Sequence, residues 1–176
     1  MKKIFLSILA ITFALAVSAQ QTWSNDPYHS RLGFVVKHLT ISEITGHFTE
    51  FSVKVKTSKP DYTDMKVTVS AKTASISTGV EMRDNHLKTA DFFDVQQFPE
   101  LKFESTAVKK LSDKKFVLSG NLTMHGVTKP VKLNVVYYGV VENPMNKKST
   151  FGFHIVGSVK RSDFGIGPKF SGSYCK

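Results

Sequence analysis

The chain is poor in cysteine: it holds a single one, Cys175, next to the C-terminal Lys176. One cysteine cannot form an internal disulfide, so a fold held together by disulfides is excluded. No recognisable pattern around Cys175 would activate its thiolate for catalysis. We therefore interpret this cysteine as incidental to function.

Acidic residues are also scarce, with 14 Asp and Glu against 24 Lys and Arg and a formal net charge of +10. Such an excess of cations suits nucleic acid, acidic lipid headgroups or simple solubility. The lysines form no block, because they are spread singly along strand-like segments, as at Lys54, Lys56, Lys66 and Lys132. This spacing favours a solvated basic face over a nucleic-acid site.

The apolar run at the N-terminus is too short to span a membrane. It covers Ile4 to Val17, fewer than the roughly 20 residues that a spanning helix needs. Lys2 and Lys3 precede it, and small residues around Ala19 end it. We predict a signal peptide at residues 1–19, cleaved after Ala19, and a periplasmic or secreted protein without nucleic-acid partners; a retained anchor is the alternative. No cysteine follows the run, which excludes a lipoprotein signal.

Polar and apolar residues alternate through most of the remaining chain, as in strands that bury one face. Turn-forming pairs such as Asp26-Pro27, His125-Gly126 and Asn143-Pro144 separate the alternating runs. Short links between such strands predict an antiparallel sheet, and no linker divides residues 20–176, so we expect one domain. The alternating runs are residues 31–38, 51–56, 65–72, 101–104, 116–124, 131–138 and 151–160.

One segment breaks the alternation. Thr78 and Glu81 have the spacing of a capping box, which predicts a helix that begins there and ends at about Thr89. Asp91 could cap a further turn through Phe92 and Phe93. An aromatic pair after a helix in an all-β chain needs a buried place, so we expect this segment to lie across one mouth of a barrel.

The bulky residues of the alternating runs share one face, so the sheet must curl. Closing it into a barrel removes two edges that are prone to aggregation, and eight strands leave room for side chains or one small ligand. The predicted inner face carries no Asp, Glu, Lys or Arg, which suits only an apolar ligand; a core filled by side chains is the alternative. The inner face comprises Phe34, Val36, Val67, Val69, Phe103, Leu122, Met124, Leu133, Phe153 and Ile155.

Four motifs follow one another along the chain. They are His38-Leu39 with Gly46-His47-Phe48 and Phe51, residues 83–94 with Phe98-Pro99 and Phe103, residues 120–131, and residues 161–165. Together they resemble the YceI-like family over residues 22 to about 171. The resemblance implies a lipocalin-like barrel that binds polyisoprenoid or quinone-type lipids in the periplasm, in lipid transport, storage or stress response. It implies no catalytic residue.

From the resemblance we expect an all-β chain that forms a single antiparallel lipocalin-like barrel with one short helix between strands. Residues 20–176 would form this lipid-binding domain, with a long apolar lipid as its partner and transient contact with the membrane. We assign no catalytic residue, metal ligand or cofactor. The expected ligand-binding residues are Phe34, Val36, His38, Phe48, Val67, Val69, Phe92, Phe103, Leu122 and Phe153.

Two other functions compete with lipid binding, and the polar residues bear on both. A lipid-modifying enzyme on the same barrel would need a titratable group in the lumen, where strand parity places only His38. On the helix, Asp84 and His86 do not face each other, so a structural role for Arg83 or Asp84 is favoured. The six histidines lack the convergent spacing of a metal site. The second competitor is an envelope-association protein that uses its basic outer face.

The C-terminal segment departs from the family pattern. Arg161 could fix a loop or meet a ligand headgroup, and the loop role is favoured. After residues 161–165, relatives continue into one more strand, but no alternating segment follows here, so we expect the final closing strand to be missing. The strands around Thr22-Trp23-Ser24 and at residues 150–160 would then be unpaired on one side, which predicts lower stability and a tendency to dimerise or aggregate there.

Overall fold

The computed structural model describes residues 20–39 and 41–168. The predicted signal peptide, Cys175 and the segment that follows Pro168 lie outside these described residues. The expectation of a missing closing strand rests on that last segment and stays a prediction.

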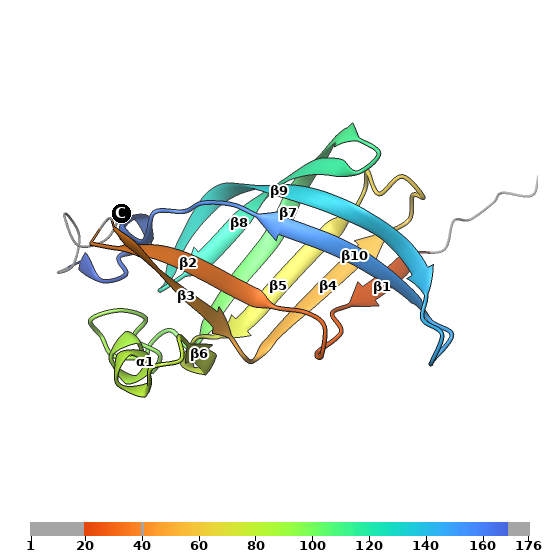
Figure 1. Ribbon diagram of the computed structural model, residues 1–176. Coiled ribbons are helices and arrows are strands. Elements are labelled where there is room, and N and C mark those ends of the chain that lie inside the picture. Colours follow the sequence, from red (N-terminus) through yellow and green to blue (C-terminus); the bar gives the residue numbers. More distant parts are fainter. Residues whose placement is uncertain (1–19, 40, 169–176) are drawn as a thin grey trace, which may run out of the picture.

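Ten strands arranged in two antiparallel sheets make up most of the described chain (Figure 1), which confirms the all-β prediction. The larger sheet has the order β1-β4-β5-β7-β8-β9-β10, and the smaller has the order β2-β3-β6. The large sheet comprises β1 (Gln21–Ser24), β4 (Phe51–Thr57), β5 (Lys66–Lys72), β7 (Glu100–Ser112), β8 (Lys115–Met124), β9 (Val127–Glu142) and β10 (Ser149–Val156). The small sheet comprises β2 (Leu32–His38), β3 (Ser42–Phe48) and β6 (Ile76–Ser77).

The large sheet curls into a half-barrel. Its edges are β1, which pairs with β4, and β10, which pairs with β9; within the described residues no strand pairs with their other sides. The edges meet through side chains instead, because the rings of Trp23 and Phe151 pack with their centroids 3.8 Å apart. The described part of the barrel is therefore closed at this point by a ring contact rather than by a hydrogen-bonded ladder.

Two apolar clusters fill the concave side. The first lies toward the helix and centres on Phe48, Ile76, Leu101, Met124 and Phe164. The second lies farther along the sheet and comprises Met65, Val67, Phe103, Phe116, Leu118 and Val135. Leu122 packs against both. Burying these faces is the main force that holds the curl, at roughly 25 cal/mol for each Å² of apolar surface removed from water.

The strands differ from the alternating runs where the register shifts. A bulge between Ser105 and Ala107 lets β7 continue to Ser112, and beyond it Val108 packs against the second cluster. Two further shifts occur, one between Lys110 and Ser112 of β7 and one in β9, where Tyr138 is the extra residue opposite Gly152 and Phe153 of β10. A bulge adds one residue to a strand and reverses which residues face inward, so a simple period of two ends there. β10 also ends at Val156 rather than Lys160.

The helix differs from its prediction at both ends. α1 spans Glu81–Leu87, and its first cap position is Val80, without a side-chain cap. The predicted capping box is therefore wrong, because the Thr78 hydroxyl is held by Asp84 and Arg83. The helix ends before Thr89, whose hydroxyl donates a hydrogen bond to the His86 carbonyl at 2.8 Å and turns the chain.

Candidate functional site

The candidate site is the concave face of the half-barrel, and most of the predicted ligand-binding residues come together there. Four of them belong to or pack against the first cluster: Phe34, Phe48, Phe92 and Leu122. Val67, Val69, Phe103 and Phe153 belong to or pack against the second, again with Leu122. Val36 is half-buried on β2, whereas His38 at the end of that strand is exposed. Ile155 of the predicted inner face is also exposed.

Two glycines shape this face, because the absence of a side chain lets an aromatic ring pack directly against the backbone. A Cβ on Gly46 would lie 2.2 Å from the nearest ring atom of Phe34, and one on Gly120 would lie 2.5 Å from the ring of Phe103. Both rings therefore lie flat against neighbouring backbone, where any larger residue would push them into the concave space. The alternation placed Gly120 on the inner face, but it gave no reason for a glycine there.

At the β1 and β10 edges the concave face becomes aromatic. Around Phe151 the ring centroids of Tyr62, Tyr137 and Phe153 lie 5.8, 6.3 and 6.3 Å away, and Trp23 packs on it from β1. We call Trp23, Tyr62, Tyr137, Phe151 and Phe153 the aromatic end. Only Phe153 was among the predicted site residues. The shared parity of Phe151 and Phe153 could have indicated one more, but Tyr62 lies in a turn and Trp23 on another edge.

The aromatic end contains neutral polar groups. The hydroxyls of Tyr62 and Tyr137 lie 3.3 Å apart, within hydrogen-bond distance. Burial, followed by the hydrogen bond to Tyr137, raises the pKa of Tyr62 to about 12. Both effects disfavour the phenolate, so Tyr62 stays protonated at neutral pH.

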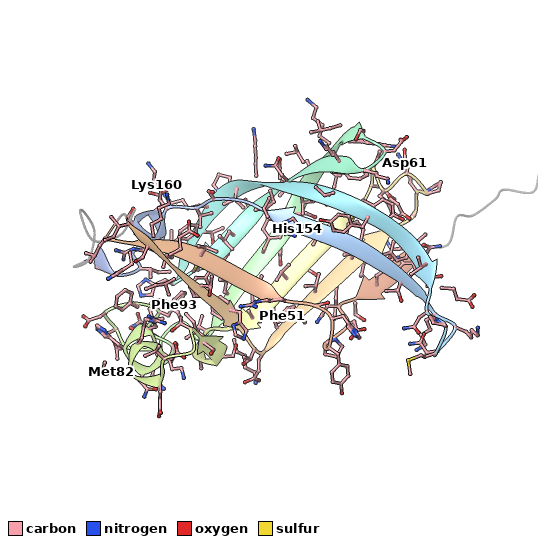
Figure 2. The ribbon with its side chains drawn as sticks, in the orientation of Figure 1. Phe51, Asp61, Met82, Phe93, His154 and Lys160 are labelled. Carbon is pink, nitrogen blue, oxygen red and sulfur yellow. The ribbon has the colours of Figure 1, made fainter. Side chains whose placement is uncertain are left out.

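A polar network holds α1 over the opposite end, where Phe93 packs against Phe48 while Met82 points away into solvent (Figure 2). Asp84 accepts a hydrogen bond from the Thr78 amide at 2.8 Å, and Arg83 donates one to the Thr78 carbonyl at 3.0 Å. The prediction that Arg83 or Asp84 binds loop backbone is confirmed.

The other polar residues singled out by the sequence also bind close neighbours. His86 Nε2 lies 3.2 Å from a carboxylate oxygen of Asp91, while Asp84 is engaged with Thr78. Arg161 Nη1 donates to the carbonyls of Ile166 and Gly167, each at 2.8 Å, so the prediction that it fixes its loop is confirmed. In the part of the chain that the structure describes, no three His, Cys, Asp or Glu side chains gather as a metal site would require.

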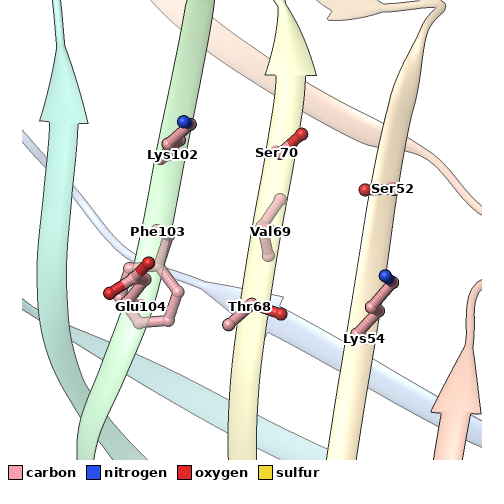
Figure 3. Close-up of a pocket in the computed structure, with 8 residues that line it drawn as sticks. All are labelled: Ser52, Lys54, Thr68, Val69, Ser70, Lys102, Phe103 and Glu104. Carbon is pink, nitrogen blue, oxygen red and sulfur yellow. The ribbon is translucent and has the colours of Figure 1, made fainter.

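The convex face is polar. A shallow hollow of about 260 Å³ lies across β4, β5 and β7 (Figure 3), and the side chains of Lys54, Ser70, Lys102 and Glu104 stand around it. A larger hollow of about 750 Å³ lies beside β9, where the segment after β10 passes Pro130. Among the described residues, no helix combines the length and the apolar character needed to cross a membrane.

Comparison with known proteins places this architecture in a family. The model of the YceI-like domain matches residues 23–173. The chain belongs to the YceI-like family. This confirms the resemblance seen in the four motifs.

One curated relative is similar in sequence, and two solved structures are similar in both sequence and fold. A UPF0312 protein of Staphylococcus aureus (strain N315) is 37% identical over 141 residues, which are 80% of each chain. The crystal structure of the Campylobacter jejuni YceI protein matches with a TM-score of 0.69 and 33% identity, over 85% of this chain and 86% of that one. Burkholderia cenocepacia BcnA matches with a TM-score of 0.71 and 27% identity, over 85% and 87%.

A more distant structure shares the fold alone. It is a polyisoprenoid-binding domain from Saccharophagus degradans implicated in plant cell wall breakdown. The match has a TM-score of 0.50 and 15% identity, and covers 77% of this chain and 76% of that one.

Proposed function

We propose that this YceI-like protein binds a long apolar lipid, of polyisoprenoid or quinone type, along the concave face of its half-barrel. The observation that carries the proposal is the continuity of that face. Leu122 joins the two apolar clusters, and the second continues through Phe153 into the aromatic end. An elongated apolar surface with few polar groups suits a chain-like hydrocarbon, because burial of apolar area is the driving force and is non-directional.

The fold shared with the Saccharophagus degradans polyisoprenoid-binding domain supports the same ligand class. We propose a binding role rather than catalysis, since the charged side chains of Asp84 and Arg161 next to the concave face are engaged in fixing α1 and the loop after β10. The protein would transport or store its lipid, or serve a stress response, with transient contact with the membrane.

The proposed site of action is the periplasm or the exterior of the cell, reached through cleavage after Ala19. Lys2, Lys3 and the apolar run that follows support export. The intact mass of protein recovered from the envelope fraction tests this. We expect a mature chain that begins at Gln20, and a mass that includes Met1 would contradict cleavage.

Extraction of the purified protein with organic solvent, followed by mass spectrometry, tests the lipid proposal. We expect an isoprenoid lipid in the extract. Phe153→Asp should lose at least nine-tenths of it, because burying a carboxylate in apolar surroundings costs several kcal/mol, roughly, unless it is protonated. His154→Asp is the matched control, since His154 is the exposed next residue of β10 (Figure 2).

Two outcomes would contradict the proposal. One is wild-type protein that yields no lipid and takes up neither a polyprenol nor a quinone when these are added. The other is equal lipid retention by Phe153→Asp and the wild type when both have the same melting temperature.

A further inference from the structure

The aromatic end contains a hydrogen-bond donor that none of the described residues satisfies. Trp23 Nε1 is buried, and among the described residues it makes no hydrogen bond. Trp23 lies opposite Val55 in the register of β1 and β4, and Val55 packs against the second cluster. Directly paired residues of an antiparallel ladder point to the same face, so the indole lies on the concave side.

A buried donor without an acceptor is unusual, because it gives up its hydrogen bond to water and gains none in return. Most such groups in native proteins are explained by strain, by function or by a bound molecule. Trp23 is held by its ring contact with Phe151, and no residue that the structure describes accepts a hydrogen bond from its N–H. The simplest use for its N–H is to bind an acceptor that the ligand brings.

The tyrosine pair supplies a second donor beside the same Phe151 ring. Two protonated hydroxyls carry two protons, and their mutual hydrogen bond uses only one of them. The hydroxyl that accepts this bond keeps its own proton and can donate it elsewhere. The aromatic end thus offers two neutral donors, one indole N–H and one phenol O–H, in otherwise apolar surroundings.

We propose that the aromatic end binds the headgroup of the lipid, and that this headgroup is an uncharged oxygen acceptor such as a hydroxyl, carbonyl or ether. Trp23 Nε1 donates to this oxygen, and the Tyr62–Tyr137 pair supplies the second hydrogen bond. An uncharged oxygen fits because both donors are neutral and the five members of the aromatic end carry no cation to offset a buried phosphate. The apolar tail then extends past Phe153 toward Leu122 and α1. This inference rests on the proposed lipid-binding function.

Matched probes separate the headgroup from the tail. Phytanol is a branched isoprenoid alcohol. Phytane has the same skeleton without the oxygen, and phytanyl phosphate has the same chain with a charged headgroup. Binding to the delipidated full-length protein is measured by native mass spectrometry. The emission of Trp23, the only tryptophan in the chain, gives a second and local signal. We expect phytanol to bind about tenfold more tightly than phytane, the scale of one net hydrogen bond, and more tightly than the phosphate.

Variants assign this preference to the proposed donors. Trp23→Phe keeps an aromatic ring but removes the N–H, so the preference for phytanol over phytane should fall to about threefold or less while phytane still binds. Replacing both tyrosines, Tyr62→Phe together with Tyr137→Phe, should lower the preference independently, because a single remaining phenol could still donate. This variant retains Trp23 as a reporter if Trp23→Phe folds poorly. Tyr138→Phe is the matched control and should change nothing, because Tyr138 is exposed on β9.

The outcomes distinguish this inference from the proposed function. If the wild type binds phytanol and phytane equally, or if neither variant alters the preference, the headgroup assignment is wrong while lipid binding stands. If phytanyl phosphate binds most tightly, the uncharged class is wrong. If none of the three probes binds while a polyprenol or a quinone does, the headgroup assignment is wrong; if none of these lipids binds, the proposed function itself fails.

Discussion

At the scale of single residues, close approach of backbone and ring shapes the concave face. Gly120 pairs with Ser105 across the β7–β8 ladder, and the ring of Phe103 reaches over it; a Cβ there would lie 2.5 Å from the Glu104 carbonyl oxygen as well as from the ring. The ring can move, but the carbonyl belongs to a paired strand and cannot move without distorting the ladder. Glycine is therefore required by space rather than by backbone conformation at this position.

We expect Gly120→Ala to lower the free energy of unfolding by about 1–3 kcal/mol, the usual cost of overpacking a core. Ser119→Ala, one residue earlier on β8, is the control and should change stability by no more than about 0.5 kcal/mol. Urea denaturation followed by circular dichroism measures both. Equal stability of Gly120→Ala and the wild type would show that β7 and β8 can separate locally without cost.

The stability of the fold should depend on pH through the protonation of Asp64. The hydrogen bond from the Thr57 hydroxyl, supported by the Ser58 and Lys59 amides, lowers the pKa of Asp64 below its usual value of 3.8. A group with a lowered folded-state pKa stabilises the fold above its unfolded pKa and loses that contribution as pH falls through the folded pKa. Below about pH 4 this contribution is progressively lost.

We therefore expect Asp64→Asn to be less stable than the wild type at pH 7 and to lose less stability between pH 5 and pH 2. Thermal melts at a series of pH values measure the difference. Asp113→Asn is the control, because the Asp113 side chain is 97% exposed in the turn between β7 and β8. Parallel pH curves for the wild type and Asp64→Asn would contradict this role.

At the scale of elements, alternation predicted the strands whose faces differ in burial, and it missed those whose pattern is broken. β4, β5 and β8 begin and end within a residue or two of their alternating runs. The alternation did not predict β3, because Gly46 occupies one of its inward positions, where an apolar side chain would continue the pattern. The capping box failed because the Thr78 amide and hydroxyl both donate to Asp84, so the hydroxyl does not cap the start of the helix. Tertiary contacts decided each of these cases.

The convex face of the large sheet carries a repulsive pair that substitution should relieve. Lys56 on β4 lies directly opposite Lys66 on β5, and both are exposed. Like charges opposite each other on a ladder are destabilising, and opposite charges stabilise by roughly 0.2–1 kcal/mol. We expect Lys66→Glu to raise the free energy of unfolding by about this amount at low salt.

Chemical denaturation at low and high ionic strength checks this prediction. The gain should shrink at 1 M salt, where the Debye length is about 3 Å. Lys132→Glu is the matched control, because Lys132 lies opposite the uncharged Ser119. A gain of the same size in both variants would mean that lower net charge, rather than the pair, is responsible.

At the scale of the whole molecule, the closure of the half-barrel and the candidate site depend on contacts between distant parts of the chain. The parity of the strands predicted the apolar lining, including Phe103 and Leu122, because inward faces repeat locally. It could not predict the aromatic end, where Trp23 meets Phe151 across two sheet edges and Tyr62 joins them from a turn. No local period encodes which two edges will meet.

We expect Phe151→Ala to loosen the closure. It should lower stability by about 1–3 kcal/mol through lost ring contacts, and it should speed amide exchange in β1 more than in β5. Hydrogen exchange followed by mass spectrometry, on peptides that cover Gln21–Ser24 and Lys66–Lys72, measures this. Val141→Ala is the control, because Val141 is 66% exposed on neighbouring β9. If Phe151→Ala speeds amide exchange equally in both peptides, the contact between Trp23 and Phe151 is not what closes the half-barrel.

The strand order of the large sheet also has a kinetic consequence. β7, β8, β9 and β10 follow one another as hairpins, so each pairing closes only a short loop, whereas β1 reaches β4 across the whole of β2 and β3. Longer loops cost more entropy to close, so the hairpin series is the expected folding nucleus. The contact between Trp23 and Phe151, which joins the first strand to the last, would form after the transition state. Substitutions there should speed unfolding and leave the folding rate almost unchanged.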